Sequence, residues 1–145
     1  MTCAIHPGMS TRSLIGKQNS DGSVAFVYCH FDGYLKGVGN TLLLNYSSPA
    51  KVDALLAEGD VSSIGAAIGE QHPFNDRPDG VCTFYGRDRG ETGIDAKTAA
   101  DSAAYLQGNY GARYFYLLRD TGWVFSTEGK PFEALTAEAI AQAEE

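Results

Sequence analysis

The chain has 145 residues, of which 43% are hydrophobic and 20% are charged, as is typical of one globular domain. No apolar run approaches the ~18 residues of a membrane span, and Met1 to Ser13 lacks the basic-then-apolar order of a secretory signal. The net charge of −7 argues against duplex DNA as a partner, because lysine and arginine supply most of the affinity for its phosphates. We expect a cytoplasmic protein with one domain over residues 9–145. Residues 1–8 are expected to form a flexible extension, with Met9 as an alternative start.

The cysteines and histidines are few and widely spaced. Three cysteines without a CxxC pair predict neither a disulfide framework nor a zinc site. Cys29 and Cys82 lie within apolar runs, which favours buried thiols. The three histidines are also far apart in the sequence, so we predict no metal ion and no cofactor.

The first half of the chain begins with a clear β-hairpin pattern. Two alternating segments rich in apolar and aromatic residues flank Asn19–Gly22, a turn sequence. Ser48, Pro49 and Gly59 are the residues expected at the cap, the first turn and the stop of a helix. The expected elements are therefore strands over 12–18 and 23–31, a loop over 32–40, a short helix or buried strand over 41–48, a helix over 49–58 and a short helical turn within 61–70.

The second half predicts a strand, a helix, a second hairpin and a last helix. The alanine-rich segment 94–108 favours a helix, and the aromatic segment 112–120 favours a strand. The expected elements are a loop over 71–80, a strand over 81–86, a loop over 87–93, a helix over 94–108, paired strands over 112–120 and 123–128, and a helix over 133–145. This order predicts an α+β fold, with an antiparallel sheet of about five strands and helices mainly on one face.

The stretch "FYGRDRGE" is the first candidate site. Arg87 and Arg89 follow a strand end between two glycines, and guanidinium groups bind phosphate through paired hydrogen bonds. Phe84 and Tyr85 should face opposite sides of the sheet, leaving one ring to stack on a base. The alternative interpretation is a surface loop in which the two arginines pair with their acidic neighbours.

Two further segments hold candidate ligand contacts. In "YCHFDGY", His30 and Asp32 are two residues apart, a spacing that suits general-base work, ligand contact or a turn, and Tyr34 could stack on a base. In "ARYFYLLRD", Arg113 joins an aromatic strand that suits either nucleic-acid stacking or the core. Arg113 becomes a ligand candidate if this strand neighbours residues 81–86.

The motifs "TRSLIG", "YCHFDGY", "LLAEGDVSS" and "YGRDRGE" resemble those of a family of small proteins encoded by tailed phages and prophages. The resemblance runs from about Met9 to Gly93, and we associate no firm activity with the family. It implies an accessory protein acting in the bacterial host cell. The chain could be similar to the Thoeris anti-defence sponges, oligomeric proteins that sequester cyclic ADP-ribose isomers. No binding residue is carried over from them.

Three functions remain open on the sequence. The leading hypothesis is a homo-oligomeric, non-catalytic protein that sequesters a small cyclic nucleotide through Phe84, Arg87, Arg89, Arg113, His30 and Tyr34. The second is an acidic inhibitor that binds a host defence or nucleic-acid enzyme, as the net charge suggests. The third is a phosphodiesterase or nuclease that uses His30 and Asp32.

Overall fold

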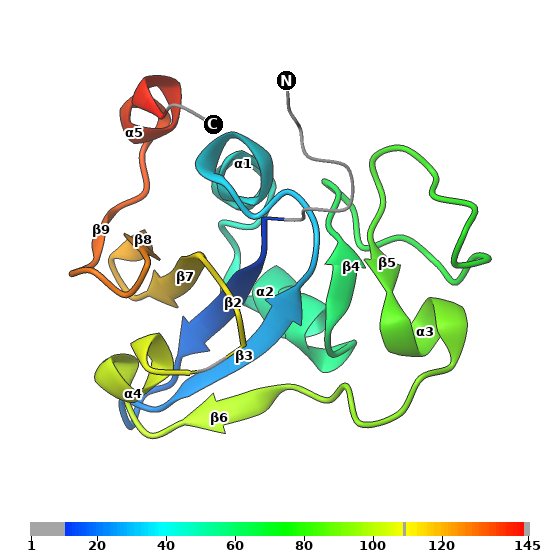
Figure 1. Ribbon diagram of the computed structural model, residues 1–145, viewed down its shortest axis with the longest axis horizontal. Helices are drawn as coiled ribbons and strands as arrows, with labels where there is room; N and C mark the ends of the chain where they lie inside the picture. The colour runs from blue at the N-terminus through cyan, green and yellow to red at the C-terminus, as the bar shows by residue number, and fades with distance from the viewer. Residues whose placement is uncertain (1–10, 109, 144–145) are drawn as a thin grey trace.

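A computed structural model describes residues 11–108 and 110–143, so the extension expected over residues 1–8 and Cys3 lie outside the described part. Within the described residues, one sheet of eight strands runs through the fold (Figure 1). Its order is β5-β4-β3-β2-β7-β8-β9, and β6 pairs with β3 beside this path. The strands are β2 (Ser13–Gln18), β3 (Val24–Cys29), β4 (Val61–Ser63), β5 (Thr83–Phe84), β6 (Lys97–Ala99), β7 (Tyr114–Arg119), β8 (Gly122–Thr127) and β9 (Glu133–Ala134).

The sheet is mixed, so the expectation of about five antiparallel strands is wrong. The β2–β3 and β7–β8 hairpins are present as predicted, but β2 pairs with β7 in parallel and β3 pairs with β4 in parallel. Parallel neighbours need a crossover connection, and the helices between β3 and β4 provide one. The sequence showed the hairpins because their turns are local, whereas parallel pairing depends on contacts far apart in the chain.

The helices are short, and most of them follow local signals. They are the π-helical turn η1 (Leu35–Gly39), α1 (Asn40–Asn45), α2 (Pro49–Ala57), α3 (Tyr85–Arg89), α4 (Ser102–Leu106) and α5 (Ala137–Gln142). The prediction of α2 is confirmed, because Pro49 is its first residue and Gly59 adopts the positive φ of 82° that ends it.

Several segments differ from their predicted elements. Residues 61–63 form β4 instead of a helical turn, and the arginine loop contains α3. The helix expected over 94–108 is divided into β6 and α4, because the Asp101 carboxylate caps the helix by accepting from the Ala104 N–H at 2.8 Å. Likewise α5 begins only after Thr136, whose side chain accepts from the Ala139 N–H at 3.0 Å.

Alternating strand residues build an apolar layer on each face of the sheet. Ile15, Val27 and Tyr116 join the larger cluster, which also holds buried residues of η1, α1, α2 and α5. Leu14 and Phe26 point the other way, into a smaller cluster that includes α4. Cys29 and Cys82 are buried without a disulfide, and burial raises the pKa of the Cys29 thiol to about 12.

Candidate functional site

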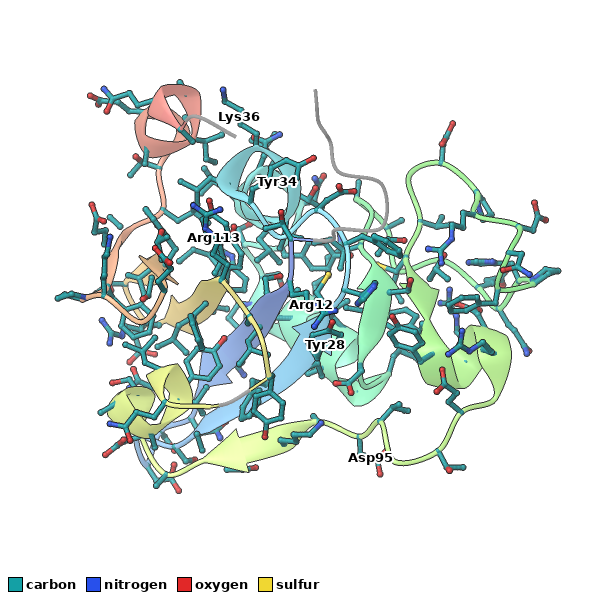
Figure 2. All side chains as sticks on the ribbon, in the orientation of Figure 1. Arg12, Tyr28, Tyr34, Lys36, Asp95 and Arg113 are labelled. Carbon is teal, nitrogen blue, oxygen red and sulfur yellow. The ribbon has the colours of Figure 1, made fainter. Side chains whose placement is uncertain are left out.

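The six predicted ligand contacts lie in three separate places. Phe84, Arg87 and Arg89 lie on β5 and α3, His30 and Tyr34 follow β3, and Arg113 precedes β7. Strands β4, β3 and β2 separate β5 from β7, which puts these two strands roughly 19 Å apart at the usual ~4.8 Å spacing. The sequence made Arg113 a ligand candidate only if its strand neighbours residues 81–86, and the two strands are not neighbours. Figure 2 shows Arg113 at the start of β7, apart from Arg12 and Tyr28.

Arg113 lines a different hollow. Its guanidinium lies 5.7 Å from the centroid of the Tyr114 ring, and it borders a cavity of about 480 Å³ together with Phe115 and Glu128. Arg113 therefore lines a hollow that is separate from the "FYGRDRGE" segment.

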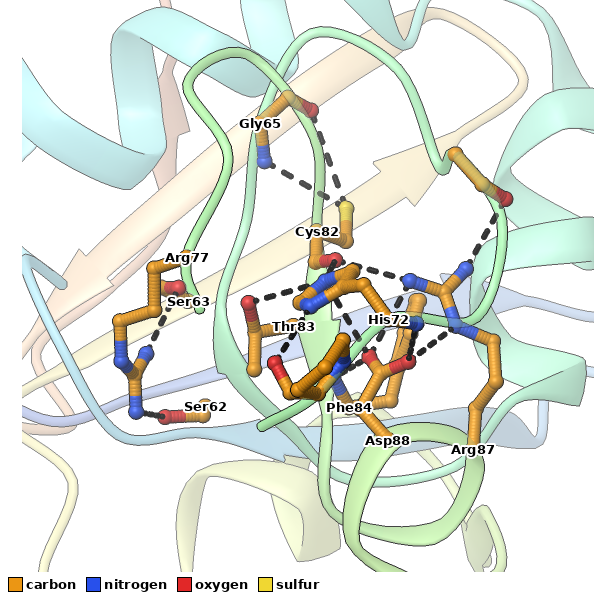
Figure 3. A network of polar contacts seen from close by, with 12 residues as sticks. Ser62, Ser63, Gly65, His72, Arg77, Cys82, Thr83, Phe84, Arg87 and Asp88 are labelled. Carbon is orange, nitrogen blue, oxygen red and sulfur yellow. Dashed lines mark hydrogen bonds and ion pairs between the residues drawn. The ribbon is translucent and has the colours of Figure 1, made fainter. Parts of the chain in front are cut away.

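Phe84 and Arg87 belong to the interior of the fold. Phe84 is fully buried, and the Arg87 guanidinium lies 4.7 Å from its ring centroid. Nε and Nη2 of Arg87 donate to the Asp88 carboxylate at 2.9 and 3.1 Å. The other donors are bound by the carbonyls of Ile68, Gly69 and Cys82, each at 2.9 Å. All five guanidinium N–H groups therefore have acceptors within the chain, and none remains for a phosphate (Figure 3).

Asp88 and His72 complete a buried polar clamp around Arg87. Asp88 also accepts from the backbone N–H groups of Phe84 at 2.7 Å and of His72 at 3.1 Å. Burial opposes ionisation of Asp88, but the hydrogen bonds from Arg87, Phe84 and His72 outweigh it and lower the Asp88 pKa. The clamp fixes the loop over residues 64–82 against β5 and α3.

The ring of His72 is held at both nitrogens. Nδ1 lies 2.8 Å from the Pro73 carbonyl oxygen and Nε2 lies 3.1 Å from that of Cys82. These two hydrogen bonds raise the His72 pKa, and the nearby Asp88 adds to the shift. Thr83 Oγ1 and the Asp88 carboxylate both face Nε2, at 3.4 and 3.6 Å. A catalytic relay needs hydroxyl and carboxylate on opposite nitrogens, so this cluster is structural.

Arg89 lies on the surface between two rings. Its guanidinium lies 4.5 Å from the Phe74 centroid and 5.2 Å from that of Tyr85, and it forms an ion pair with Glu91. The pairing with Glu91 matches the alternative interpretation of the arginine loop, and the two rings contact the Arg89 guanidinium itself. The Arg89 guanidinium is therefore already engaged by two rings and a carboxylate, which makes it a weaker anion site than a free guanidinium.

The arginine that sequence reasoning missed is Arg77. Its guanidinium lies 4.9 Å from the Phe74 centroid and 5.4 Å from that of Phe31. Nη1 donates to Ser63 Oγ at 3.2 Å and Nη2 to Ser62 Oγ at 3.0 Å (Figure 3). These two hydrogen bonds occupy two of its five donors. The available signal is a phenylalanine and an arginine three residues apart in the otherwise polar segment 71–80, for which the sequence predicts only a loop.

Rings and arginines thus alternate along one surface. We name this set the aromatic–arginine ladder, and it consists of Phe31, Arg77, Phe74, Arg89 and Tyr85. Phe31 is one of the few large apolar residues with notable exposure, at 37%. At its end of the ladder, Phe31, Asp32, Ser63 and Arg77 line a hollow of about 330 Å³.

His30 lies beside this hollow and contacts Tyr28 and Phe31. Tyr28 Oη lies 2.7 Å from His30 Nδ1, and the His30 ring meets the Phe31 ring edge-on at 4.6 Å between centroids. Burial lowers the His30 pKa, and the positive charges of Arg12 and Arg77 lower it further. Figure 2 shows Arg12 beside Tyr28, at the start of β2 and the end of β3.

The predicted pairing of His30 with Asp32 is replaced by another arrangement. Strand β3 ends at Cys29, and Asp32 turns away from the strand direction with a φ of 58°. The Asp32 carboxylate accepts from Tyr34 Oη at 3.2 Å, while the Tyr28 hydroxyl lies 2.7 Å from Nδ1 of His30. Tyr34 therefore lies at the same end of the sheet as the hollow and positions one of its walls.

A larger hollow of about 680 Å³ lies at the opposite end of the sheet. It lies between the β2–β3 turn and the start of α2, and it is lined by Lys17, Gln18, Asn19, Ser20, Gly22, Pro49 and Asp120. It has no aromatic wall, and its lysine is already paired with Asp53 at 2.8 Å. The smaller hollow at the ladder combines an aromatic ring, Phe31, with a cation, Arg77, and so suits a ligand that carries both a ring and a negative charge.

In the described part of the chain, no three His, Cys, Asp or Glu side chains are grouped so that they could hold a metal ion. Among the same residues, no helix has the length and apolar character needed to cross a membrane. Comparison of the chain with protein families, with curated proteins and with solved structures returns no match.

Proposed function

We propose that the protein binds a small nucleotide-like anion at the aromatic–arginine ladder and holds it without cleaving it. The observation that carries this proposal is the position of Arg77. It lies between the rings of Phe31 and Phe74 and borders the hollow, and three of its five N–H donors have no acceptor among the described residues. A stacked guanidinium with open donors suits a phosphate beside an aromatic base.

Local charge supports an anionic ligand despite the net charge of −7. The ion pairs of the described residues include neither Arg12 nor Arg77. Both arginines lower the pKa of His30, so their positive potential reaches the same side chain. A small positive region on an acidic protein attracts a small anion, while the surrounding negative charge disfavours a long nucleic acid.

The size and walls of the hollow fit a nucleotide unit. Its volume of about 330 Å³ is near the lower end of ligand pockets, roughly 300–1,000 Å³. Stacking of a base on an aromatic ring contributes about 1–3 kcal/mol. Phe31 and Arg77 supply an aromatic wall and a cation on adjacent sides of the same hollow.

The arrangement around His30 favours binding over hydrolysis. General-base work needs an oriented imidazole, and the usual orienting group is a carboxylate on the second ring nitrogen. Here Nδ1 faces the Tyr28 hydroxyl, and Asp32 binds Tyr34. Together with the resemblance to phage proteins, this supports sequestration of a cyclic nucleotide immune signal as the biological role.

The decisive experiment measures binding of a panel of cyclic dinucleotides, cyclic trinucleotides and cyclic ADP-ribose isomers by calorimetry and thermal shift. A ligand at about 100 times its Kd should add ~2.7 kcal/mol of stability. Arg77→Ala should abolish the effect. Arg119→Ala is a matched control, because Arg119 also lies 4.9 Å from a ring centroid, that of Phe132, at the far end of β7.

The bound molecule should then be released by heat and identified by mass. Intact ligand agrees with sequestration. Chemically altered ligand would overturn it and would return the function to a phosphodiesterase that uses His30. No binding across the panel would also overturn it, and the search would move to a host protein partner.

A further inference from the structure

The ligand hollow carries opposite charges that do not neutralise each other. Asp32 and Arg77 line the same 330 Å³ hollow, with Phe31 as the aromatic wall. No ion pair within 4.0 Å joins these two side chains, and the ion pairs of the described residues leave both out. A ligand that is anionic at one end and rich in N–H donors at the other would satisfy both charges at once.

The backbone holds Asp32 in place for such a contact. Its φ of 58° is uncommon for a residue other than glycine, and strained backbone of this kind concentrates at functional sites. The Val38 N–H donates to the Asp32 carbonyl at 2.8 Å, and Tyr34 Oη donates to Oδ1 at 3.2 Å. Gly37 packs so tightly here that an added Cβ would overlap the Asp32 carbonyl oxygen. These contacts fix the carboxylate at the rim of the hollow.

A fixed carboxylate discriminates among bases by their hydrogen-bonding edges. An ionised carboxylate only accepts, and its two oxygens match two adjacent N–H donors. The guanine edge presents such a pair, N1–H beside the N2 amino group. The corresponding adenine edge presents one donor beside a ring-nitrogen acceptor, whose lone pair would face a carboxylate oxygen.

We infer that Asp32 is the specificity-determining residue of the site and selects a guanine-containing nucleotide. The inference rests on the proposed function and narrows its ligand class. In this arrangement the base lies against Phe31 with its donor edge on Asp32, and the phosphate faces Arg77.

Titration calorimetry with cyclic di-GMP against cyclic di-AMP, and with GMP against AMP, tests the inference. A bidentate contact to a base discriminates by about 1–3 kcal/mol, so we expect guanine ligands to bind roughly 10- to 100-fold more tightly. Asp32→Asn should remove this preference and raise affinity for xanthosine monophosphate, whose edge pairs one N–H with a carbonyl. Asparagine tolerates positive φ, so the variant should keep the backbone.

Asp120→Asn is the matched control, because it removes the same charge from the hollow at the opposite end of the sheet. It should leave the preference unchanged. Equal binding of guanine and adenine ligands, or a preference that survives in Asp32→Asn, would overturn the inference while leaving nucleotide binding intact. Failure of every nucleotide to bind would instead overturn the proposed function together with the inference.

Discussion

The guanidinium carbon of Arg87 lies 4.7 Å from the centroid of the buried Phe84 ring, and the same side chain donates to Asp88. Arg87→Ala should therefore destabilise the protein strongly, because it leaves the buried Asp88 carboxylate without its cation. Breaking such a pair costs about 3–5 kcal/mol. Urea denaturation measures the change.

Arg77→Ala is the comparison for that experiment, since Arg77 is exposed and bonds only two serine hydroxyls. Its free energy of unfolding should change by less than about 1 kcal/mol. Equal losses in the two variants would contradict the assignment of Arg87 to the interior.

The clamp at His72 should weaken as the pH rises. Its hydrogen bonds to the carbonyls of Pro73 and Cys82 raise its pKa, so the charged form stabilises the fold. This contribution is complete below the unfolded-state pKa of about 6.5 and is lost as the pH rises through the higher folded-state pKa. A neutral ring can donate to only one of the two carbonyls.

Hydrogen exchange of the loop over residues 64–82, corrected for intrinsic rates, should therefore show more frequent opening at pH 8 than at pH 6. In His72→Gln this extra pH dependence should disappear. An unchanged dependence in the variant would show that another group is responsible.

The pKa of His30 should report the charge of its neighbours. Burial lowers it first, and Arg12 and Arg77 lower it further. Replacing Arg77 with alanine removes one positive charge, so the His30 pKa should rise toward its ordinary value. NMR titration of the imidazole protons measures this shift. Arg119→Ala, which alters a distant arginine, should leave the titration curve unmoved.

Two helix caps make a matched pair for stability. The Asp101 carboxylate accepts from the Ala104 N–H at 2.8 Å, whereas the Ser48 side chain makes no cap hydrogen bond to α2. Asp101→Ala should cost about 1 kcal/mol of unfolding free energy, and Ser48→Ala should change it by under ~0.5 kcal/mol. The reverse ranking in thermal melts would count against the cap assignment.

The sequence predicted elements whose signals are local. The hairpins around residues 19–22 and 120–122 and the helix between Pro49 and Gly59 follow from turn and cap residues within a few positions. The mixed sheet was missed because β2–β7 and β3–β4 pairing joins segments that share no local pattern.

The candidate site was predicted in part, for a similar reason. Two residues of the segment between His30 and Tyr34, Phe31 and Asp32, line the hollow. Arg87, however, is used inside the fold, and Arg113 precedes the distant strand β7. Arg77 was missed because its role as a candidate ligand contact depends on the neighbouring Phe31 ring, which the β3–β4 crossover brings close to it. Arg87 has all five N–H donors bound within the chain, whereas Arg77 has only two bound among the described residues, and this difference is visible only in the structure.

The parallel pairing of β2 with β7 also bears on how the chain folds. Ser13 and Tyr114 are register partners although about a hundred residues separate them, and both strands lie at the centre of the sheet. The entropy of closing so long a loop opposes their contact, and topologies of this kind fold slowly. Until β7 has been synthesised, β2 presents an unpaired edge to solvent. The nascent chain is therefore most prone to aggregation in the interval before β7 emerges.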